Sequence, residues 1–343
     1  MPLLERLLAH HSQGVCRVTQ PMLLISGLPR TGGTFLNQLL DHHPQIWSHP
    51  HEVNIGHPDK WNWPELTPGH ASETLWERLR QRSTAAFSRQ PCYDKGSASQ
   101  LPMVISEQLQ QQLFLNIRAE AADSRPHFGR AVLNDYFSSY FLAYLDYQRR
   151  YAPDKRYLVG HASMCGLQPA FVAEFFAAYP DGILIQTLRE PLAWYRSIQH
   201  YPCPERLSLN RLYFAEEYDR AAPPVAERYW AVYCESLQTI RQSLQLYPDR
   251  ILVVTLEQLL QDARGSLAWL AERVGLDWHA ALLEQTFNGM PILPNSSHAR
   301  PGSAPTPAAG GKEPALRQAL QAYAEAASEQ CSLPHGHGHL DGL

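Results

Sequence analysis

Short apolar runs alternate with longer amphipathic stretches along most of this chain. The runs at residues 21–26 (PMLLIS), 156–160 (RYLVG), 182–188 (GILIQTL) and 250–256 (RILVVTL) have the length and the branched composition of buried strands. Helical patterns occupy much of the sequence between them. Strands that alternate with helices predict an α/β fold, in which helices flank a parallel sheet on both faces.

The longest stretch between two predicted strands is mostly helical. Within residues 71–150, six apolar residues lie near one face of a predicted helix: Leu133, Phe137, Tyr140, Phe141, Tyr144 and Leu145. A last helix is expected around 313–328. By contrast, 47–70 is polar and rich in Trp and Pro, so we expect a long loop there. Long loops inside compact domains tend to be functional.

The composition is that of a globular protein without a strong charge bias. The chain has 343 residues and a formal net charge of −4, which gives no reason to expect a nucleic acid or an acidic membrane as partner. No apolar run approaches the ~20 residues of a membrane span. We expect a single domain over 1–330, with its core at 21–300 and a disordered His- and Gly-rich tail at 331–343.

The cysteines and the first residues bear on location. Six cysteines are scattered without a C-x-x-C pair, which fits reduced thiols better than a disulfide framework. The polar residues 10–13 (HHSQ) interrupt the region where a signal peptide needs an unbroken apolar stretch. A cytoplasmic location is therefore expected.

A glycine-rich segment follows the first predicted strand. Residues 27–34 (GLPRTGGT), named the phosphate loop below, join that strand to a helix. The leucine spacing predicts this helix over 34–43, ending near Pro44. Glycines let backbone N–H groups turn inward, and a helix N-terminus adds its positive dipole end, so the segment predicts an anion-binding loop. The alternative is a joint whose glycines only allow the helix to pack tightly on the strand.

This loop departs from the Walker A pattern at one position. Gly33 stands where G-x-x-x-x-G-K-[ST] has its lysine. A nucleoside-triphosphate hydrolase uses that lysine on the β- and γ-phosphates of its substrate. Arg30 is the cation available here instead, so the loop suits a phosphate-bearing donor that is handled differently.

The sequence PRTGGTFLNQLLDHHPQI resembles the 5′-phosphosulfate-binding loop and helix of the sulfotransferases that use PAPS (3′-phosphoadenosine 5′-phosphosulfate). The family's loop is usually written P-[RK]-[ST]-G-[TS]-T. The resemblance implies a catalytic role for Arg30, near the bridging oxygen. The residues that it places against the 5′-phosphosulfate are Arg30, Thr31, Gly32, Gly33 and Thr34. Gly33 replaces the usual Thr or Ser, which puts one hydroxyl contact in question.

An arginine follows the apolar run at 182–188. Arg189 stands at the carboxyl end of a parallel strand, where open α/β sheets bind their ligands, and Pro191 suits the first turn of the next helix. Ser197 follows about two helical turns later. The plain alternative is a surface pair between Arg189 and Glu190, of little consequence.

The order of strand, R-[DE]-P, five residues and serine resembles the second signature of sulfotransferases, which holds the 3′-phosphate of PAPS. The resemblance implies that Arg189 and Ser197 bind this phosphate, with Arg196 as a weaker candidate. Residues 250–276 resemble the family's later strand and helix. The resemblance as a whole spans about 21–300 and implies the P-loop-like sulfotransferase architecture of a bacterial-type member.

A shorter match lies near the end of that span. The segment LPNSS at 293–297 resembles an N-S-S segment that some bacterial members place against the nucleotide, which adds Ser296 and Ser297 to the expected binding residues. The same residues read equally well as a plain polar loop.

Sulfuryl transfer to a hydroxyl needs a base, because a hydroxyl is a poor nucleophile until it loses its proton. Glu52 is the first candidate, since several family members carry a catalytic glutamate shortly after the phosphate-loop helix, although the register differs by a residue or two from the tyrosylprotein type. His161 is the second, because cytosolic sulfotransferases place a catalytic histidine near the end of the corresponding strand. Each is otherwise an ordinary polar side chain.

No metal site is expected. The cluster His49, His51, Glu52 and His57 matches no zinc signature, and the transfer reaction requires no metal. The expected cofactor is PAPS alone, a co-substrate that leaves as PAP.

The acceptor is expected to be a small molecule or a glycan that offers a hydroxyl or an amine. Trp47, Trp61 and Trp63 crowd the loop that should border it, and indole faces stack well on sugar rings, although tryptophans serve as often in packing. The alternative functions are a nucleotide-dependent small-molecule kinase on the same fold, and a nucleotide-binding module without catalysis.

Overall fold

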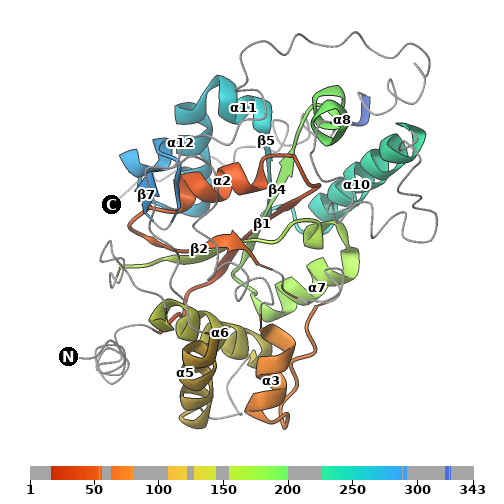
Figure 1. Ribbon diagram of the computed structural model, residues 1–343. Helices are drawn as coiled ribbons and strands as arrows, with labels where there is room; N and C mark the ends of the chain where they lie inside the picture. The colour runs from red at the N-terminus through yellow and green to blue at the C-terminus, as the bar shows by residue number, and fades with distance from the viewer. Residues whose placement is uncertain are drawn as a thin grey trace, which may run out of the picture.

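The computed structural model describes residues 17–53, 55, 63–80, 107–121, 127–143, 154–199, 226–287, 289–291, 321–323 and 325. Its centre is a parallel sheet of five strands in the order β2-β3-β1-β4-β5 (Figure 1). The strands are β1 (Met22–Gly27), β2 (Ile46–Glu52), β3 (Tyr157–His161), β4 (Ile183–Leu188) and β5 (Ile251–Thr255). The predicted parallel sheet flanked by helices is confirmed.

Each central strand contributes side chains to two apolar cores, one on either face of the sheet. Along β1, Met22 and Leu24 enter one core, whereas Leu23 and Ile25 enter the other. Successive residues of a strand point to opposite faces, so a strand that is covered on both sides must be apolar throughout. This is why four of the five strands stand out in the sequence as short apolar runs.

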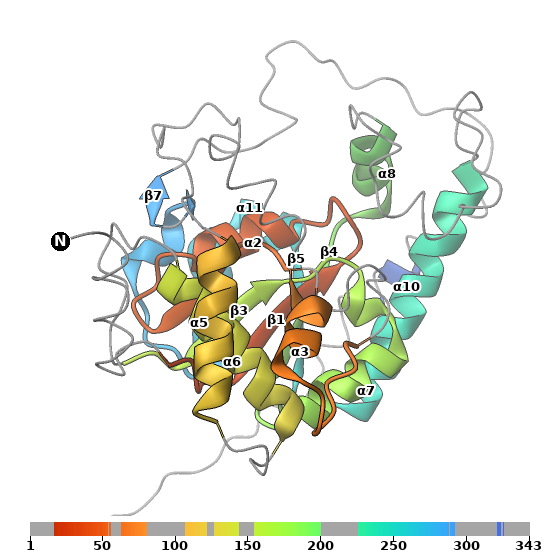
Figure 2. The ribbon, with the colours of Figure 1, turned by 60° about the horizontal axis from the view of Figure 1, so that its bottom comes forward.

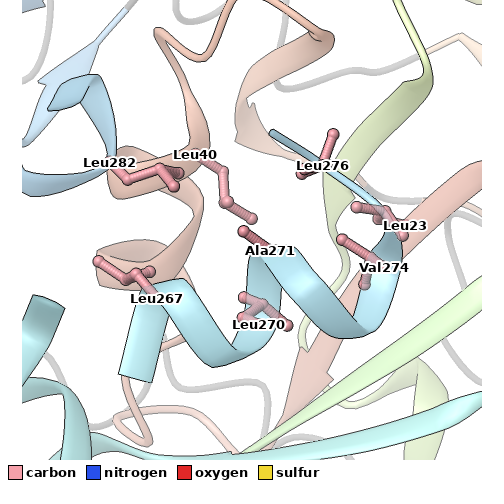
Figure 3. Close-up of a pocket in the computed structure, with 8 residues that line it drawn as sticks. All are labelled: Leu23, Leu40, Leu267, Leu270, Ala271, Val274, Leu276 and Leu282. Atoms are coloured by element: carbon pink, nitrogen blue, oxygen red, sulfur yellow. The ribbon is translucent and has the colours of Figure 1, made fainter. Parts of the chain in front are cut away.

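Helices cover both faces of the sheet (Figures 1 and 2). One face carries α2 (Gly33–Leu40), α11 (Leu256–Gln261) and α12 (Ala263–Val274). The other carries α6 (Phe128–Ala143), α7 (Pro169–Ala178), α8 (Pro191–Gln199) and α10 (Ala226–Leu246), with α3 (Ser72–Leu79) and α5 (Glu107–Ala119) packed beside α6. Figure 3 shows the cavity between α2 and α12, which aliphatic side chains alone line, so it is a packing interface and offers a ligand no polar group.

The short elements complete the chain. Two 3₁₀ turns span Cys165–Leu167 and Ala280–Leu283, and β6 (Thr286–Phe287) pairs antiparallel with β7 (Met290–Pro291). Residues 321–323 and 325 are helical, within the helix expected at 313–328. In the described part of the chain, no helix is both long and apolar enough to cross a membrane.

The helix after the phosphate loop ends three residues earlier than predicted, at Leu40. Asp41 leaves the helix to bind the β6–β7 hairpin, where its Oδ2 accepts hydrogen bonds from Thr286 Oγ1 (2.9 Å) and Gly289 N (2.7 Å). His43 then holds the turn: its Nδ1 accepts from Gln45 N (3.2 Å), so Nε2 carries the proton that it donates to a backbone carbonyl, that of Asp277 (2.9 Å).

The prediction of a long loop over 47–70 is wrong at its beginning, because β2 runs through Glu52. Two features hide this strand. β2 lies at the edge of the sheet, where Pro50 is tolerated because an edge strand needs hydrogen-bond donors on one side only. The pairing with β3 also shifts between Ser48 and Glu52, which breaks the regular alternation of the strand. His49 is buried here and packs on the ring of Tyr140, 4.3 Å between centroids.

The helical face predicted around 133–145 is confirmed as far as the structure describes it. The four predicted residues inside α6 are buried: Leu133, Phe137, Tyr140 and Phe141. Tyr144 and Leu145 lie outside the described residues. The packing of α6 on α5 also encloses an ion pair, in which Arg118 Nη1 lies 3.1 Å from Asp135 Oδ2 and both side chains are almost fully buried.

Candidate functional site

The phosphate loop begins where β1 ends, and its first residue must be glycine. Gly27 has φ of 151°, and a β-carbon there would lie 2.5 Å from the carbonyl oxygen of Thr187 on the adjacent β4. Thr31 braces the loop from inside, because its Oγ1 donates to Leu28 O (2.6 Å) and lies 2.8 Å from Thr187 Oγ1. The buried Thr31 therefore fixes the loop against the sheet, rather than offering its hydroxyl to solvent.

The far end of the loop opens into a helix. Gly32 has φ of 101°, and α2 begins at Gly33 with its first intrahelical bond from Leu36 N to Gly32 O (2.9 Å). The first N–H groups of a helix have no carbonyl within the helix to bind, and the helix dipole is positive at this end. Gly33 and Thr34 thus stand at the N-terminal end of α2, where the sequence predicts an anion-binding cradle.

Arg30 sits in the middle of the loop in a strained backbone conformation. Its φ is 73°, in the left-handed region that costs a residue with a β-carbon about 1–2 kcal/mol. Two contacts hold it there: its carbonyl accepts from Arg189 Nη1 (3.2 Å), and its own Nε donates to Ser197 Oγ (3.1 Å). Residues that surrounding contacts hold in a strained backbone conformation are frequent at functional sites.

Arg189 and Ser197 approach the loop from the next strand. Arg189 follows β4, and Ser197 lies on α8, which both views place beside the loop between β1 and α2 (Figures 1 and 2). The carboxylate of Glu190 caps α8 by accepting from the N–H groups of Leu192 (3.0 Å) and Ala193 (2.6 Å). Glu190 is thus used by its own helix, against the alternative that it pairs with Arg189 at the surface.

The guanidinium of Arg189 is largely buried, with 7% of the residue exposed. Burial lowers the pKa of Arg189 below its ordinary value, whereas the carboxylate of Glu257 raises it. An arginine keeps its charge in spite of such shifts. A fixed cation in a partly dry place is well suited to bind a phosphate through two hydrogen bonds.

Residues that the sequence did not single out hold these two arginines. Tyr233 donates to the carbonyl of Arg189 (2.5 Å), and Trp194 Nε1 donates to the carbonyl of Pro29 in the loop (3.0 Å). Glu257 accepts from Glu190 N (3.1 Å) and from the hydroxyl of Tyr323 (3.2 Å). The only sequence signal was the position of Trp194 between Pro191 and Ser197; Tyr233 and Tyr323 are too distant in the sequence to be found by a motif.

The two candidate bases lie side by side. Glu52 ends β2 and pairs with His161 at the end of β3, and the N–H of Val53 donates to the carbonyl of His161 (2.7 Å). His161 is buried, and its imidazole lies against Gly33 at the start of α2. The fold therefore brings Glu52 and His161 together at the carboxyl ends of β2 and β3, and places the imidazole of His161 beside the phosphate loop.

Of the remaining predicted binding residues, the structure describes Arg196, which lies on α8 next to Ser197 and is half-buried. Ser296 and Ser297 lie outside the described residues, as do Trp61, His57 and the tail. Among the residues that the structure does describe, no group of three or more His, Cys, Asp or Glu side chains could hold a metal ion.

For Trp47, the structure favours the packing alternative. Trp47 is buried in the core, 5.2 Å from the ring of Phe141, and Lys155 Nζ lies 5.2 Å from the Trp47 ring centre. Trp63 packs on Phe171 of α7, 5.2 Å between ring centroids. Trp47 therefore serves in packing, whereas Trp63 is half-buried and also lines an open cleft beside α7, so only Trp47 drops out of the case for a sugar-bearing acceptor.

Comparison with solved structures finds similar chains among bacterial sulfotransferases. The sulfotransferase domain of the curacin biosynthetic pathway is 20% identical over 78% of this chain and 77% of its own, with a TM-score of 0.44. The sulfotransferase domain of the Synechococcus PCC 7002 olefin synthase is 18% identical over 89% and 95%, with a TM-score of 0.46. A sulfotransferase from Alicyclobacillus acidocaldarius is 17% identical over 91% and 94%, with a TM-score of 0.43.

A comparison with curated proteins finds no significant match. Comparison with protein families is decisive, because the model of the sulfotransferase family matches residues 21–280, which include the phosphate loop, Glu52, His161 and the Arg189–Ser197 segment. That match covers most of the chain and both candidate anion-binding segments. The chain is therefore an enzyme of the sulfotransferase family.

Proposed function

We propose that this enzyme transfers the sulfuryl group of PAPS to the hydroxyl, or the amine, of a small-molecule acceptor and releases PAP. The observation that carries the proposal is the direct contact between the two candidate anion sites, in which Arg30 Nε of the phosphate loop donates to Ser197 Oγ of α8 (3.1 Å). PAPS carries two anionic groups on one ribose, a 5′-phosphosulfate and a 3′-phosphate. Two adjoining anion sites suit this donor better than a nucleotide with a single phosphate chain.

The position of these sites in the sheet supports the same reading. The chain visits β2 and β3 on one side of β1 and then β4 and β5 on the other, so the strand order reverses beside β1. Ligands of open α/β sheets bind at such a reversal, outside the carboxyl ends of the strands. The loop after β1 and Arg189 after β4 flank that point.

The residues suggest a division of labour. Arg30 and the first N–H groups of α2 stabilise negative charge on the 5′-phosphate as it leaves, while Arg189 and Ser197 hold the 3′-phosphate. Glu52 accepts the proton of the acceptor hydroxyl as its oxygen bonds to sulfur and the bond from sulfur to the bridging oxygen breaks. The two oxygens lie in line with the sulfur, so positioning supplies much of the rate.

Against the kinase alternative, the described residues lack a Walker lysine in the phosphate loop and an acidic magnesium ligand at the ends of the strands beside β1. The loop has no Walker lysine, since Gly33 occupies that position. The two strands beside β1 end in His161 and lead into Arg189, so neither supplies the acidic magnesium ligand that a P-loop phosphotransferase carries. We therefore retain a single function.

A transfer screen tests the proposal. Labelled PAPS would be incubated with the enzyme and with sugars, phenols, lipids, amines or peptides, in the presence and in the absence of EDTA. We expect label in at least one acceptor class, with equal turnover in EDTA. Turnover that EDTA abolishes, or phosphate transfer from ATP, would reject the proposal.

A further inference from the structure

The ring of His161 occupies the space that a side chain at Gly33 would need. A β-carbon on Gly33 would lie 2.3 Å from His161 Nε2 and 2.7 Å from its Cδ2. Real β-carbons essentially never approach other atoms so closely. The imidazole of His161 can therefore occupy this space only because residue 33 has no side chain, and in this sense the two positions are coupled.

The backbone holds His161 in this place from two sides. Residues of β3 pair with β1 on one side, where Ala162 N donates to Ile25 O (2.8 Å), and with β2 on the other, where Val53 N donates to His161 O (2.7 Å). The residue is 7% exposed, so neighbouring side chains enclose the ring. An imidazole on a rigid strand keeps its Nε2 at the N-terminal end of α2.

We propose that the imidazole of His161 binds the 5′-phosphate end of the donor from its Nε2, in place of the side-chain contact that Gly33 cannot make. The inference rests on the proposed function, because it takes the 5′-phosphosulfate of PAPS as the anion at the start of α2. A neutral imidazole with its proton on Nε2 donates one hydrogen bond, and a charged one adds attraction to the anion. In this arrangement His161 holds the donor and Glu52, its neighbour on β2, serves as the base.

Four proteins test the coupling: the wild type, His161→Ala, Gly33→Thr, and the double variant that carries both changes. Calorimetry would measure binding of PAP and of 3′-AMP, which lacks the 5′-phosphate. We expect His161→Ala to weaken PAP binding by about tenfold, the worth of a hydrogen bond to a charged group, and to leave 3′-AMP binding unchanged. Gly33→Thr should also weaken PAP binding, because its β-carbon displaces the ring.

The double variant is the decisive arm. With the imidazole gone, the threonine hydroxyl fits the vacated space and restores part of the 5′-phosphate contact, so PAP should bind more tightly than to either single variant. The inference is wrong if His161→Ala binds PAP as the wild type does, if both ligands lose affinity equally, or if the two losses simply add. A wild type that binds no PAP would instead overturn the proposed function itself.

A conservative variant keeps the test meaningful if Gly33→Thr does not fold. The side-chain amide of His161→Gln can donate a hydrogen bond from about the place of Nε2. We expect His161→Gln to bind PAP within about threefold of the wild type, while His161→Ala keeps its roughly tenfold loss. Equal losses in the two variants would overturn the inference, since they would show that the ring only fills space.

Discussion

Arg189 is the residue on which selectivity for the donor should depend. Its guanidinium is buried, its carbonyl is held by Tyr233, and its Nη1 is oriented by the carbonyl of Arg30. A preorganised guanidinium loses little entropy when it binds a phosphate. Recognition of the 3′-phosphate is therefore assigned to a side chain that the fold has already fixed.

We predict that Arg189→Ala weakens PAP binding by about 10–100-fold, the loss of a charge-assisted contact, and changes AMP binding little, because AMP has no 3′-phosphate. Calorimetric titration of both ligands measures the difference. Arg196→Ala, next to Ser197 on α8 and half-buried, is the matched control and should lose less. Equal loss of PAP and AMP in Arg189→Ala would contradict the assignment.

Arg30 should act mainly during the reaction. A group that meets charge only as the bridging oxygen departs contributes to kcat more than to ground-state binding. We predict that Arg30→Ala lowers kcat by more than it raises the dissociation constant of PAPS, and that Arg30→Lys recovers part of the rate. Single-turnover kinetics separate the two effects; a loss confined to binding would leave Arg30 as a donor-holding residue.

Glu52 is the proposed general base. Removal of a general base costs on the order of 10²–10⁴ in rate, and glutamine has nearly the same shape without the basicity. We predict that Glu52→Gln binds PAP within a few-fold of the wild type, yet loses most of its turnover at saturating acceptor. Glu73→Gln, an exposed carboxylate on α3, is the control. Near-normal turnover in Glu52→Gln beside an inactive His161→Ala would exchange the two roles.

At the scale of elements, the turn between α2 and β2 shows how a motif serves the fold. Asp41 binds the β6–β7 hairpin and His43 binds the segment after α12, so this turn fastens distant parts of the chain to α2, the helix whose N-terminus is the proposed anion cradle. The helix position thus depends on contacts far from the loop itself.

His43 gives this fastening a pH dependence. Burial holds the pKa of His43 below its ordinary value, with a partial opposing effect from its hydrogen bond to Asp277. The unfolded chain, with a histidine pKa of about 6.5, then binds more protons than the folded one on acidification. We predict that the free energy of unfolding falls below about pH 6.5, and falls less steeply in His43→Asn. Denaturant titrations between pH 7.5 and 5 measure both slopes, and identical slopes would contradict the role of His43.

Sequence patterns anticipated the elements that obey simple rules and missed those that depend on position in the fold. Four strands are continuous apolar runs because both their faces are covered, and the phosphate loop is local. β2 was missed because an edge strand tolerates Pro50 and buries polar residues such as His49. Likewise, no local pattern can show that His161 lies against Gly33, since 128 positions separate them.

At the scale of the whole molecule, one parallel sheet brings the described candidates Arg30, Glu52, His161 and Arg189 to the carboxyl ends of its strands. The strand ends next to β1 supply His161 and lead into Arg189, β1 itself leads into Arg30, and β2 ends in Glu52. We therefore propose that donor recognition, charge stabilisation and proton removal come from four separate strand ends. A single domain with a disordered tail remains a prediction of the sequence.

The most direct test of this account is a set of calorimetric titrations of the wild-type enzyme with PAP, ADP and ATP, each with and without magnesium. Two adjoining anion sites predict that PAP binds tightly, that ADP binds weakly because it lacks the 3′-phosphate, and that magnesium changes neither. ATP or ADP that binds more tightly than PAP, and does so only with magnesium, would contradict the central claim and restore the phosphotransferase.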